Sequence, residues 1–126
     1  APCHQSVQFM VTDDKEGNKL LNCMLYMSSS DVPIGRPYNI CQYSMLTMLM
    51  AHCLDYKPGL FTIVSCDTHI YANQRDIIPQ QLANTEFPLP KLVINPEKKD
   101  LFALTPDDIS IVDYQSHGEI MYPVSK

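Results

Sequence analysis

The sequence predicts an α+β fold in which long strands pack on one central, buried helix. Residues 6–11 alternate apolar and polar side chains, which is typical of a half-buried strand. Residues 40–54 are apolar on nearly all sides and rich in Leu, Met and Ala, which favours a buried helix over a strand. Residues 60–64 are mainly β-branched, aromatic and aliphatic, as expected of another strand.

The first third of the chain is expected to be a hairpin that leads into the helix. The charged residues 13–18 include a glycine and predict the turn that follows the first strand. Residues 20–27 then form the returning strand. Residues 28–37 contain several serines, prolines and a glycine, and we expect a loop there. Residues 57–59 (KPG) are expected to end the helix.

The second half is expected to contain shorter elements. The strand of residues 60–64 continues through residues 66–71, and a second helix is predicted over residues 73–82. A short strand is expected at residues 92–94 and a last strand at residues 109–112. Residues 105–108 (TPDD) are typical of a helix start, with an N-cap, a proline and two acids near the positive end of the dipole.

Composition indicates one globular domain. The chain has 126 residues, of which 45% are hydrophobic and 18% charged, a balance that a single core can accommodate. The net charge is −5 and the basic residues are scattered, so nucleic acid is not expected as a main partner. The longest apolar stretch, residues 38–54, is interrupted by polar residues and is shorter than the about 20 residues that span a bilayer. No membrane partner is therefore expected.

The cysteines indicate a reduced protein. They are five in number, lie in apolar runs and form no C-x-x-C pair, so neither a zinc site nor a disulfide framework is indicated. We therefore expect a cytoplasmic protein without a metal. No signal peptide is expected, because Pro2-Cys3-His4 leads directly into a strand.

Three places could carry chemistry, and each has a structural alternative. Cys3 alone is more often a buried, inert thiol, and its neighbour His4 adds little because adjacent strand residues face opposite ways. Asp31 and Asn39 could converge on a ligand at the start of the long helix, or simply belong to a polar capping loop. On a strand, residues 67, 69 and 71 (Asp, His, Tyr) share one face, although a satisfied buried histidine beside an edge tyrosine is an equal alternative.

Five stretches match, in order and spacing, the motifs of one enzyme family. They are Pro2-Cys3-His4 with Gln8-Phe9, residues 26–31 (YMSSSD), residues 35–40 (GRPYNI), residues 66–73 (CDTHIYAN) and residues 87–92 (FPLPKL). The corresponding motifs are P-C-H with Q-F, Y-Q-R-S-x-D, G-x-P-F-N-I, G-D-x-H-x-Y-x-N and P-x-P-K-L. On these motifs the chain resembles the C-terminal half of thymidylate synthase. Residues 1–126 are therefore expected to form the C-terminal part of such a catalytic domain, a mixed sheet packed on the helix.

The resemblance implies reductive methylation of dUMP to dTMP, with 5,10-methylenetetrahydrofolate as cosubstrate. Cys3 would be the nucleophile that adds to C6 of the pyrimidine, after which C5 takes up the one-carbon unit. Asn39 would take part in catalysis and read the uracil O4 and N3 edge, where an amide can both donate and accept. The partners implied are dUMP, the folate and a second copy of the chain or a missing N-terminal half.

The resemblance also implies roles for further residues. Asp31 would orient the folate pterin, contact the substrate and take part in catalysis. His69 and Tyr71 would hold the deoxyribose 3′-hydroxyl, and Ser29 would meet the phosphate. The remaining implied residues are Gln8 on the substrate side, and Ile34, Gly35 and Val124 on the folate side.

The chain departs from the family motifs at several positions. Ser28 replaces the arginine that grips the nucleotide phosphate and lies near the nucleophile, and Met27 replaces a glutamine. A thiol depends on nearby cations to ionise at neutral pH, so this loss affects binding and activation together. Arg36 stands at a position that is usually aliphatic and could compensate. Ser65-Cys66 replaces a glycine pair, which could crowd the approach to the phosphate.

Three interpretations remain open from the sequence. Other phosphate-binding arginines, a catalytic glutamate and a tryptophan of the family lie upstream of the P-C-H run. The chain could be a fragment, could pair with a separate N-terminal piece, or could be a non-catalytic relative that dimerises through its sheet. A pyrimidine nucleotide hydroxymethylase of the same superfamily is a further alternative, in which water attacks the exocyclic methylene. Asn39 favours uracil over cytosine but does not separate the two products.

Overall fold

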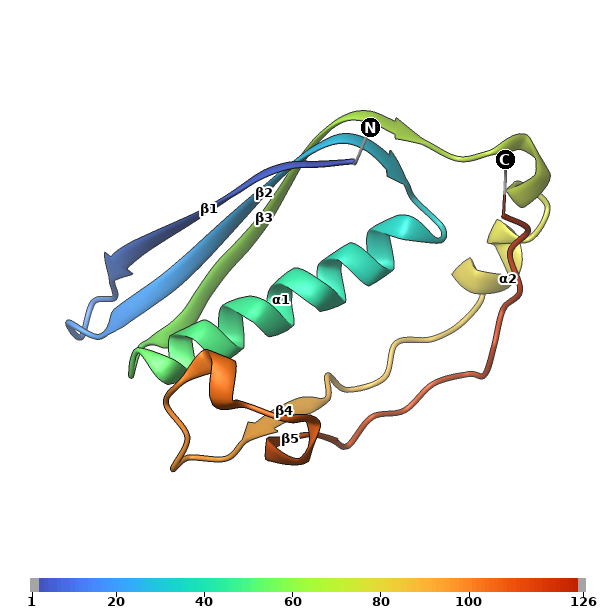
Figure 1. The fold of residues 1–126 in the computed structure, drawn as a ribbon. Helices are drawn as coiled ribbons and strands as arrows, with labels where there is room; N and C mark the ends of the chain where they lie inside the picture. The colour runs from blue at the N-terminus through green and yellow to red at the C-terminus, as the bar shows by residue number, and fades with distance from the viewer. Residues whose placement is uncertain (1–2, 125–126) are drawn as a thin grey trace.

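The computed structural model describes residues 3–124, so Pro2 of the P-C-H run lies outside the described residues. A three-stranded sheet has the order β1-β2-β3, and one long helix, α1, packs against one of its faces (Figure 1). The strands are β1 (His4–Asp13), β2 (Lys19–Asp31) and β3 (Lys57–His69), and α1 covers Gly35–Cys53. β2 is antiparallel to β1 and parallel to β3, which confirms the mixed α+β architecture.

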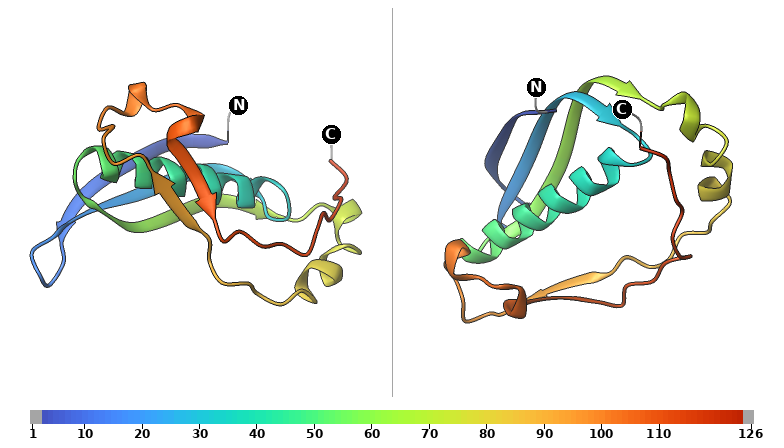
Figure 2. Two further views of the ribbon diagram at one scale, coloured as in Figure 1. Left: turned by 90° about the horizontal axis from the view of Figure 1, so that it is seen from below. Right: turned by 45° about the vertical axis from the view of Figure 1, so that its right-hand side comes forward.

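The smaller elements follow β3. A 3-10 helix covers Ala72–Gln74, α2 covers Ile78–Leu82, and β4 (Lys91–Ile94) pairs with β5 (Ile109–Val112) in an antiparallel ribbon. Two more 3-10 helices, Leu101–Ala103 and Pro106–Asp108, lie between β4 and β5. The ribbon lies on the side of α1 away from the three-stranded sheet (Figure 2). Within residues 3–124, no helix is long and apolar enough to span a bilayer.

The core lies between β2 and α1. Four side chains that alternate along β2 are almost completely buried, namely Leu21, Cys23, Leu25 and Met27. This alternation places them on one face of the strand, the face that α1 covers. α1 contributes Thr47 and Ala51 as its fully buried residues.

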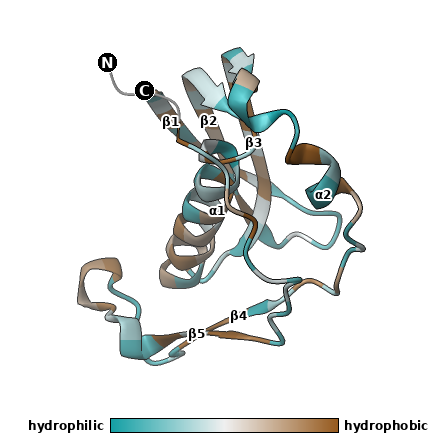
Figure 3. Ribbon diagram, turned by 90° about the vertical axis from the view of Figure 1, so that its right-hand side faces the viewer, coloured by the Kyte–Doolittle hydropathy of each residue, from teal (hydrophilic) through white to brown (hydrophobic). Residues whose placement is uncertain are grey.

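The prediction of a helix buried on all sides is only half right. In the described part of the chain, α1 still exposes Tyr38, Ile40 and Met48, and hydrophobic stretches run along it in Figure 3. The sheet covers one side of the helix, and the short β4–β5 ribbon covers little of the other. An apolar face of this kind on a helix is normally covered by further structure.

The predicted loop over residues 28–37 is wrong at both ends. β2 continues to Asp31, because the serines pair with β3 in register up to Asp31 opposite His69, and this pairing overrides their weak strand propensity. α1 begins at Gly35, so Pro37 lies in its first turn, where a missing N–H removes no helical hydrogen bond. Residues 57–59 follow the end of α1 and already belong to β3.

Two further boundaries differ from the prediction. β3 ends at His69, and Tyr71 precedes the 3-10 helix instead of continuing the strand. The helix predicted over residues 73–82 is divided in two, and α2 restarts next to Pro79. A proline disfavours helical backbone in the residue before it and has no N–H to donate, which explains why one continuous helix does not form.

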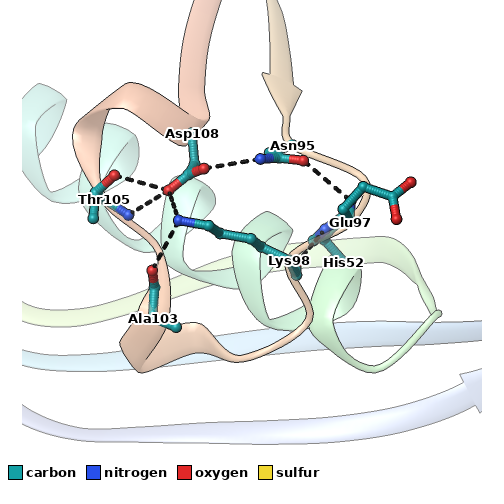
Figure 4. Close-up of polar contacts among 7 residues, drawn as sticks. All are labelled: His52, Asn95, Glu97, Lys98, Ala103, Thr105 and Asp108. Carbon is teal, nitrogen blue, oxygen red and sulfur yellow. Dashed lines mark hydrogen bonds and ion pairs between the residues drawn. The ribbon is translucent and has the colours of Figure 1, made fainter.

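The loop between β4 and β5 is fixed by Asp108 (Figure 4). Its carboxylate accepts hydrogen bonds from Lys98 Nζ (2.8 Å), Asn95 Nδ2 (2.9 Å) and both Thr105 N (2.9 Å) and Thr105 Oγ1 (2.8 Å). These bonds hold the pKa of Asp108 well below its usual range, and the bond to Lys98 has the largest effect. His52 Nε2 of α1 donates to the Lys98 carbonyl (2.9 Å), so the loop is attached to the C-terminal end of the long helix.

Candidate active site

Cys3 is fixed to the central strand at the start of β1. Its carbonyl oxygen accepts hydrogen bonds from Ser28 N (2.9 Å) and from Ser28 Oγ (3.3 Å). The thiol belongs to no disulfide and the residue is exposed. The sequence left open whether Cys3 is a buried, inert thiol or a reactive one. In the structure Cys3 is exposed and therefore accessible to a ligand.

Asn39 and His4 meet across the gap between α1 and β1. Asn39 Nδ2 lies 2.8 Å from His4 Nε2, and Tyr43 OH lies 3.0 Å from His4 Nδ1. Because an amide nitrogen can only donate, His4 Nε2 is the acceptor and its proton resides on Nδ1, where it points to Tyr43. Asn39 Oδ1 has no hydrogen-bond partner among the described residues, so it is available to a ligand.

His4 and Tyr43 are contacts that the sequence prediction missed. The register of β1 against β2 shifts between His4 and Ser6, and such an irregularity re-aims side chains. Simple alternation from the sequence could not predict this. Tyr43 lies four residues after Asn39 and therefore on the same face of α1, a spacing from which it could have been found.

A second group of polar side chains lies where β2 and β3 end. Asp31 is the cross-strand partner of His69. Asp31 Oδ2 accepts a hydrogen bond from Gln74 Nε2 (3.3 Å), and the fully buried Gln74 accepts another from Tyr71 N (3.0 Å) through Oε1. The His69 and Tyr71 rings lie edge to face, with centroids 4.8 Å apart. Gln74 was not predicted, since an isolated glutamine carries no sequence signal of burial.

Several atoms of this second group lack partners. Asp31 Oδ1 and both ring nitrogens of His69 are buried and make no hydrogen bond within the described chain. Asp67 Oδ1 lies 3.4 Å from His69 Nδ1, but the pair does not have hydrogen-bond geometry, and the Asp67 side chain is 71% exposed. Buried polar atoms are normally paired, so these unpaired atoms indicate a place where a ligand supplies the missing hydrogen bonds.

Gly35 leaves space between the two groups. A Cβ on Gly35 would come within 3.7 Å of Asp31 Cβ and 4.0 Å of Asn39 Oδ1. Gly35 therefore lies between the carboxylate at the end of β2 and the amide of α1. Asp31 and Asn39, the two residues that the sequence predicted to converge at the start of the helix, thus both lie next to Gly35.

A cavity adjoins this region. It has a volume of about 720 Å³ and is lined by the start of α1 and by the C-terminal segment. Ile34 and Val124 both line it, so two residues predicted for one side of the site are brought together. Phe87 and His117 also line the cavity, with stacked rings 4.4 Å apart.

Two further predicted site residues, Gln8 and Ser29, lie outside the two groups described above. Gln8 is paired with Met24 on the sheet face that points away from α1, because cross-strand partners share a face. It lines a separate cavity there, with Tyr26 and Leu60, and does not join the other site residues. Ser29 is half-buried near the end of β2, opposite Asp67, next to the residue that anchors Cys3.

The described residues contain no group of three or more His, Cys, Asp or Glu side chains that could hold a metal ion. What the site offers is an exposed thiol, an amide with a free acceptor, and an unpaired carboxylate oxygen and imidazole near a cavity with a mixed polar and apolar lining. Such groups suit a polar organic ligand that carries both donors and acceptors.

Comparison with known proteins gives two matches. A family model described as thymidylate synthase matches residues 1–126. Among solved structures, the chain is similar to the thermostable thymidylate synthase A from Bacillus subtilis, with 29% sequence identity and a TM-score of 0.87. The match covers 98% of this chain and 42% of that protein. The chain thus spans less than half the length of the enzyme that it matches.

Proposed function

The chain belongs to the thymidylate synthase family, and from this premise we propose that it forms the C-terminal part of an active site that methylates dUMP to dTMP. The observation that carries the proposal is the 2.8 Å contact between Asn39 and His4. It holds an amide with a free acceptor beside the residue that follows the exposed thiol. An amide that can bind a pyrimidine edge is thereby attached to His4, and the proposed nucleophile is the preceding residue of the same segment.

In this proposal Cys3 acts on the pyrimidine ring. Its thiolate forms a bond to C6, and the electron pair of the C5–C6 double bond moves to C5, which becomes the nucleophile. Asn39 Oδ1 accepts the N3–H of uracil, and the second proton of its Nδ2 is free to donate to O4. Later loss of the C5 proton and expulsion of the Cys3 thiolate restore the double bond.

His69 and Tyr71 are proposed to bind the sugar. The ring nitrogens of His69 are buried and unpaired, so a hydroxyl that approaches them gains a hydrogen bond without displacing one. Ser29 is proposed to meet the phosphate. Gln8 is left out of the proposed site because it lies on the opposite face of the sheet.

The residues present also fit the folate. Asp31 Oδ1 is a buried, unpaired acceptor, which suits the N–H donors of a pterin, and the adjoining cavity offers Ile34 and Val124 as apolar walls. When bound, 5,10-methylenetetrahydrofolate would supply the one-carbon unit and the hydride. Gly35 keeps the space beside Asp31 free of a side chain.

We also propose that two copies associate through the open face of the sheet. That face exposes Met10, Leu60 and Val64 and contains a cavity of about 410 Å³. An exposed apolar patch of this kind commonly marks an interface. A homodimer and a cytoplasmic location remain proposals that follow from family membership.

Adduct formation tests the proposed function. The protein that carries this chain is incubated with 5-fluoro-dUMP and methylenetetrahydrofolate, then denatured and digested for mass spectrometry. We expect a covalent adduct on Cys3, the same adduct in Cys41→Ser, which alters another exposed cysteine, and none in Cys3→Ser. No adduct at saturating ligand would support a non-catalytic relative. Analysis of the product from dUMP then separates dTMP from hydroxymethyl-dUMP.

A further inference from the structure

Arg36 has an unusual set of partners for a half-buried cation. Its Nε donates to Ser30 Oγ (3.2 Å) and one terminal nitrogen donates to Ser65 Oγ (2.8 Å). Ser30 is on β2 and is 2% exposed, while Ser65 is on β3. The guanidinium is therefore held in place by two strands of the sheet.

The guanidinium of Arg36 has no carboxylate partner among the described residues. Among residues 3–124, no carboxylate lies within 4.0 Å of Arg36, and its other terminal nitrogen makes no hydrogen bond there. Removing a cation from water without a counter-ion is unfavourable. A fixed guanidinium with unused donors therefore favours the binding of an anion with several oxygens.

The surrounding hydroxyl groups are also ready to donate. Ser30 Oγ and Ser65 Oγ accept from Arg36, so these two bonds use neither hydroxyl hydrogen. Ser65 Oγ lies 2.8 Å from Thr68 Oγ1, and whichever of the two donates, one hydroxyl hydrogen of the pair stays free. The cluster of Arg36, Ser30, Ser65 and Thr68 thus offers donors from both guanidinium and hydroxyl groups.

The cluster lies beside the proposed active site. Arg36 is in the first turn of α1, which has no acidic residue there and no side-chain cap, so the positive end of the helix dipole is not compensated by the chain itself. Asn39 follows one turn later. Ser30 lies two residues after Ser28, which binds the carbonyl of Cys3.

We propose that Arg36, oriented by Ser30 and Ser65, binds the phosphate of the nucleotide substrate and supplies the charge that Ser28 does not. The inference rests on the proposed function, because it names dUMP as the source of the phosphate. Arg36 would then determine specificity, because a nucleotide carries the phosphate that it binds and a nucleoside does not. Ser30 and Ser65 are positioning residues that hold the guanidinium.

The test compares dUMP with deoxyuridine, which lacks only the phosphate. Dissociation constants of both ligands are measured by calorimetry for the protein that carries this chain and for Arg36→Leu. Loss of a charge-assisted contact is expected to reduce the preference for dUMP over deoxyuridine by about 10- to 100-fold. An unchanged preference would overturn the proposal, as would an equal loss of both affinities in a folded variant.

Further variants separate a direct role from damage to the fold. Arg75→Leu removes the same charge from an exposed arginine and is expected to leave the preference unchanged. Ser65→Ala keeps the charge but removes one tether, and a smaller loss of preference, about 2- to 10-fold, is expected. If Arg36→Leu does not fold, Ser65→Ala becomes the deciding variant. An unchanged preference for dUMP over deoxyuridine in Ser65→Ala would overturn the proposal that the sheet positions Arg36 for the phosphate.

Inorganic phosphate distinguishes failure of this inference from failure of the proposed function. If the unaltered protein binds neither dUMP nor deoxyuridine, the proposed function fails. Broadening of the ³¹P signal of inorganic phosphate by the unaltered protein and by Arg75→Leu, but not by Arg36→Leu, would then still support an anion site at Arg36. Broadening that does not depend on Arg36 would overturn the site.

Discussion

Asp31 and His69 are cross-strand partners at the ends of β2 and β3, and each has buried polar atoms without a hydrogen-bond partner in residues 3–124. Parallel strands bring their carboxyl ends to the same edge of a sheet, and the start of α1 follows β2 at that edge. The unpaired atoms of the two residues therefore lie at the same edge of the sheet, near the start of α1. Keeping them unpaired lowers the stability of the unliganded protein.

The substitution His69→Leu should make the protein more stable and weaken its binding of dUMP. An apolar side chain removes two unpaired buried nitrogens, so the free energy of unfolding should rise by about 1 kcal/mol, while dUMP should bind about tenfold more weakly. Thermal unfolding and calorimetry measure the two effects. His52→Leu is the matched control, because it breaks the bond to the Lys98 carbonyl and should lower stability by about 1 kcal/mol. A loss of stability in His69→Leu would contradict the interpretation.

Tyr43→Phe tests whether His4 positions Asn39. The variant leaves His4 Nδ1 without its partner at 3.0 Å, so His4 and the amide that it orients become less well fixed. We expect kcat/KM for dUMP to fall by about 2- to 10-fold. Tyr26→Phe, on the opposite face of the sheet, should leave kcat/KM unchanged. Equal effects of the two variants would remove the basis for a positioning role.

Ser28→Arg tests whether an arginine at position 28 can bind the same phosphate as Arg36. An arginine there should tighten binding of dUMP, and by more in the Arg36→Leu background than in the unaltered protein, because the two cations would serve the same phosphate. The expected rescue is about tenfold. A double-mutant cycle measures the coupling between the two positions. Purely additive effects would mean that the two side chains do not share a ligand.

Asp108→Asn should destabilise the β4–β5 loop in a pH-dependent way. The pKa of Asp108 is lowered in the folded protein, mainly by its bond to Lys98, so the ionised carboxylate adds stability above its unfolded pKa near 4. That contribution declines as the pH falls below about 4 towards the lower folded pKa. Melting temperatures of the two proteins should therefore differ most at pH 7 and converge in acid. Asp107→Asn removes the same charge from an exposed neighbour and should give a smaller difference that varies less with pH.

The sequence predicted the principal elements because their patterns are local. Alternation identified β1, its position after the charged turn identified β2 as the returning strand, and apolar content identified α1. The end of β2 was missed because serines become strand residues only when β3 is beside them. The position of Pro37 inside the first turn of α1 likewise depends on where the chain emerges from the sheet.

The site was predicted in part for the same reason. Asp31 and Asn39 could be grouped at the start of the long helix, and both lie next to Gly35. The sequence placed His69 in a separate group with Asp67 and Tyr71, and only the strand pairing brings it opposite Asp31. The orientation of His4 depends on a register shift, and the contacts of Arg36 depend on the approach of two strands. Neither can be read from residue types. The motif that contains Gln8 does not state which face of the sheet it occupies, and the structure places it on the face away from α1.

The last residues of β2 carry several separate attachments within one short length of strand. Ser28 binds Cys3, Ser30 binds Arg36, and Asp31 binds Gln74. Successive strand residues are about 3.3 Å apart and alternate between faces, so one pairing register sets all of these distances at once. Inserting or deleting a single residue within β2 would reverse the faces and dismantle every attachment together, whereas a change in the exposed turn around Gly17 would be absorbed locally. The number of residues in β2 is therefore constrained independently of the identity of any one side chain.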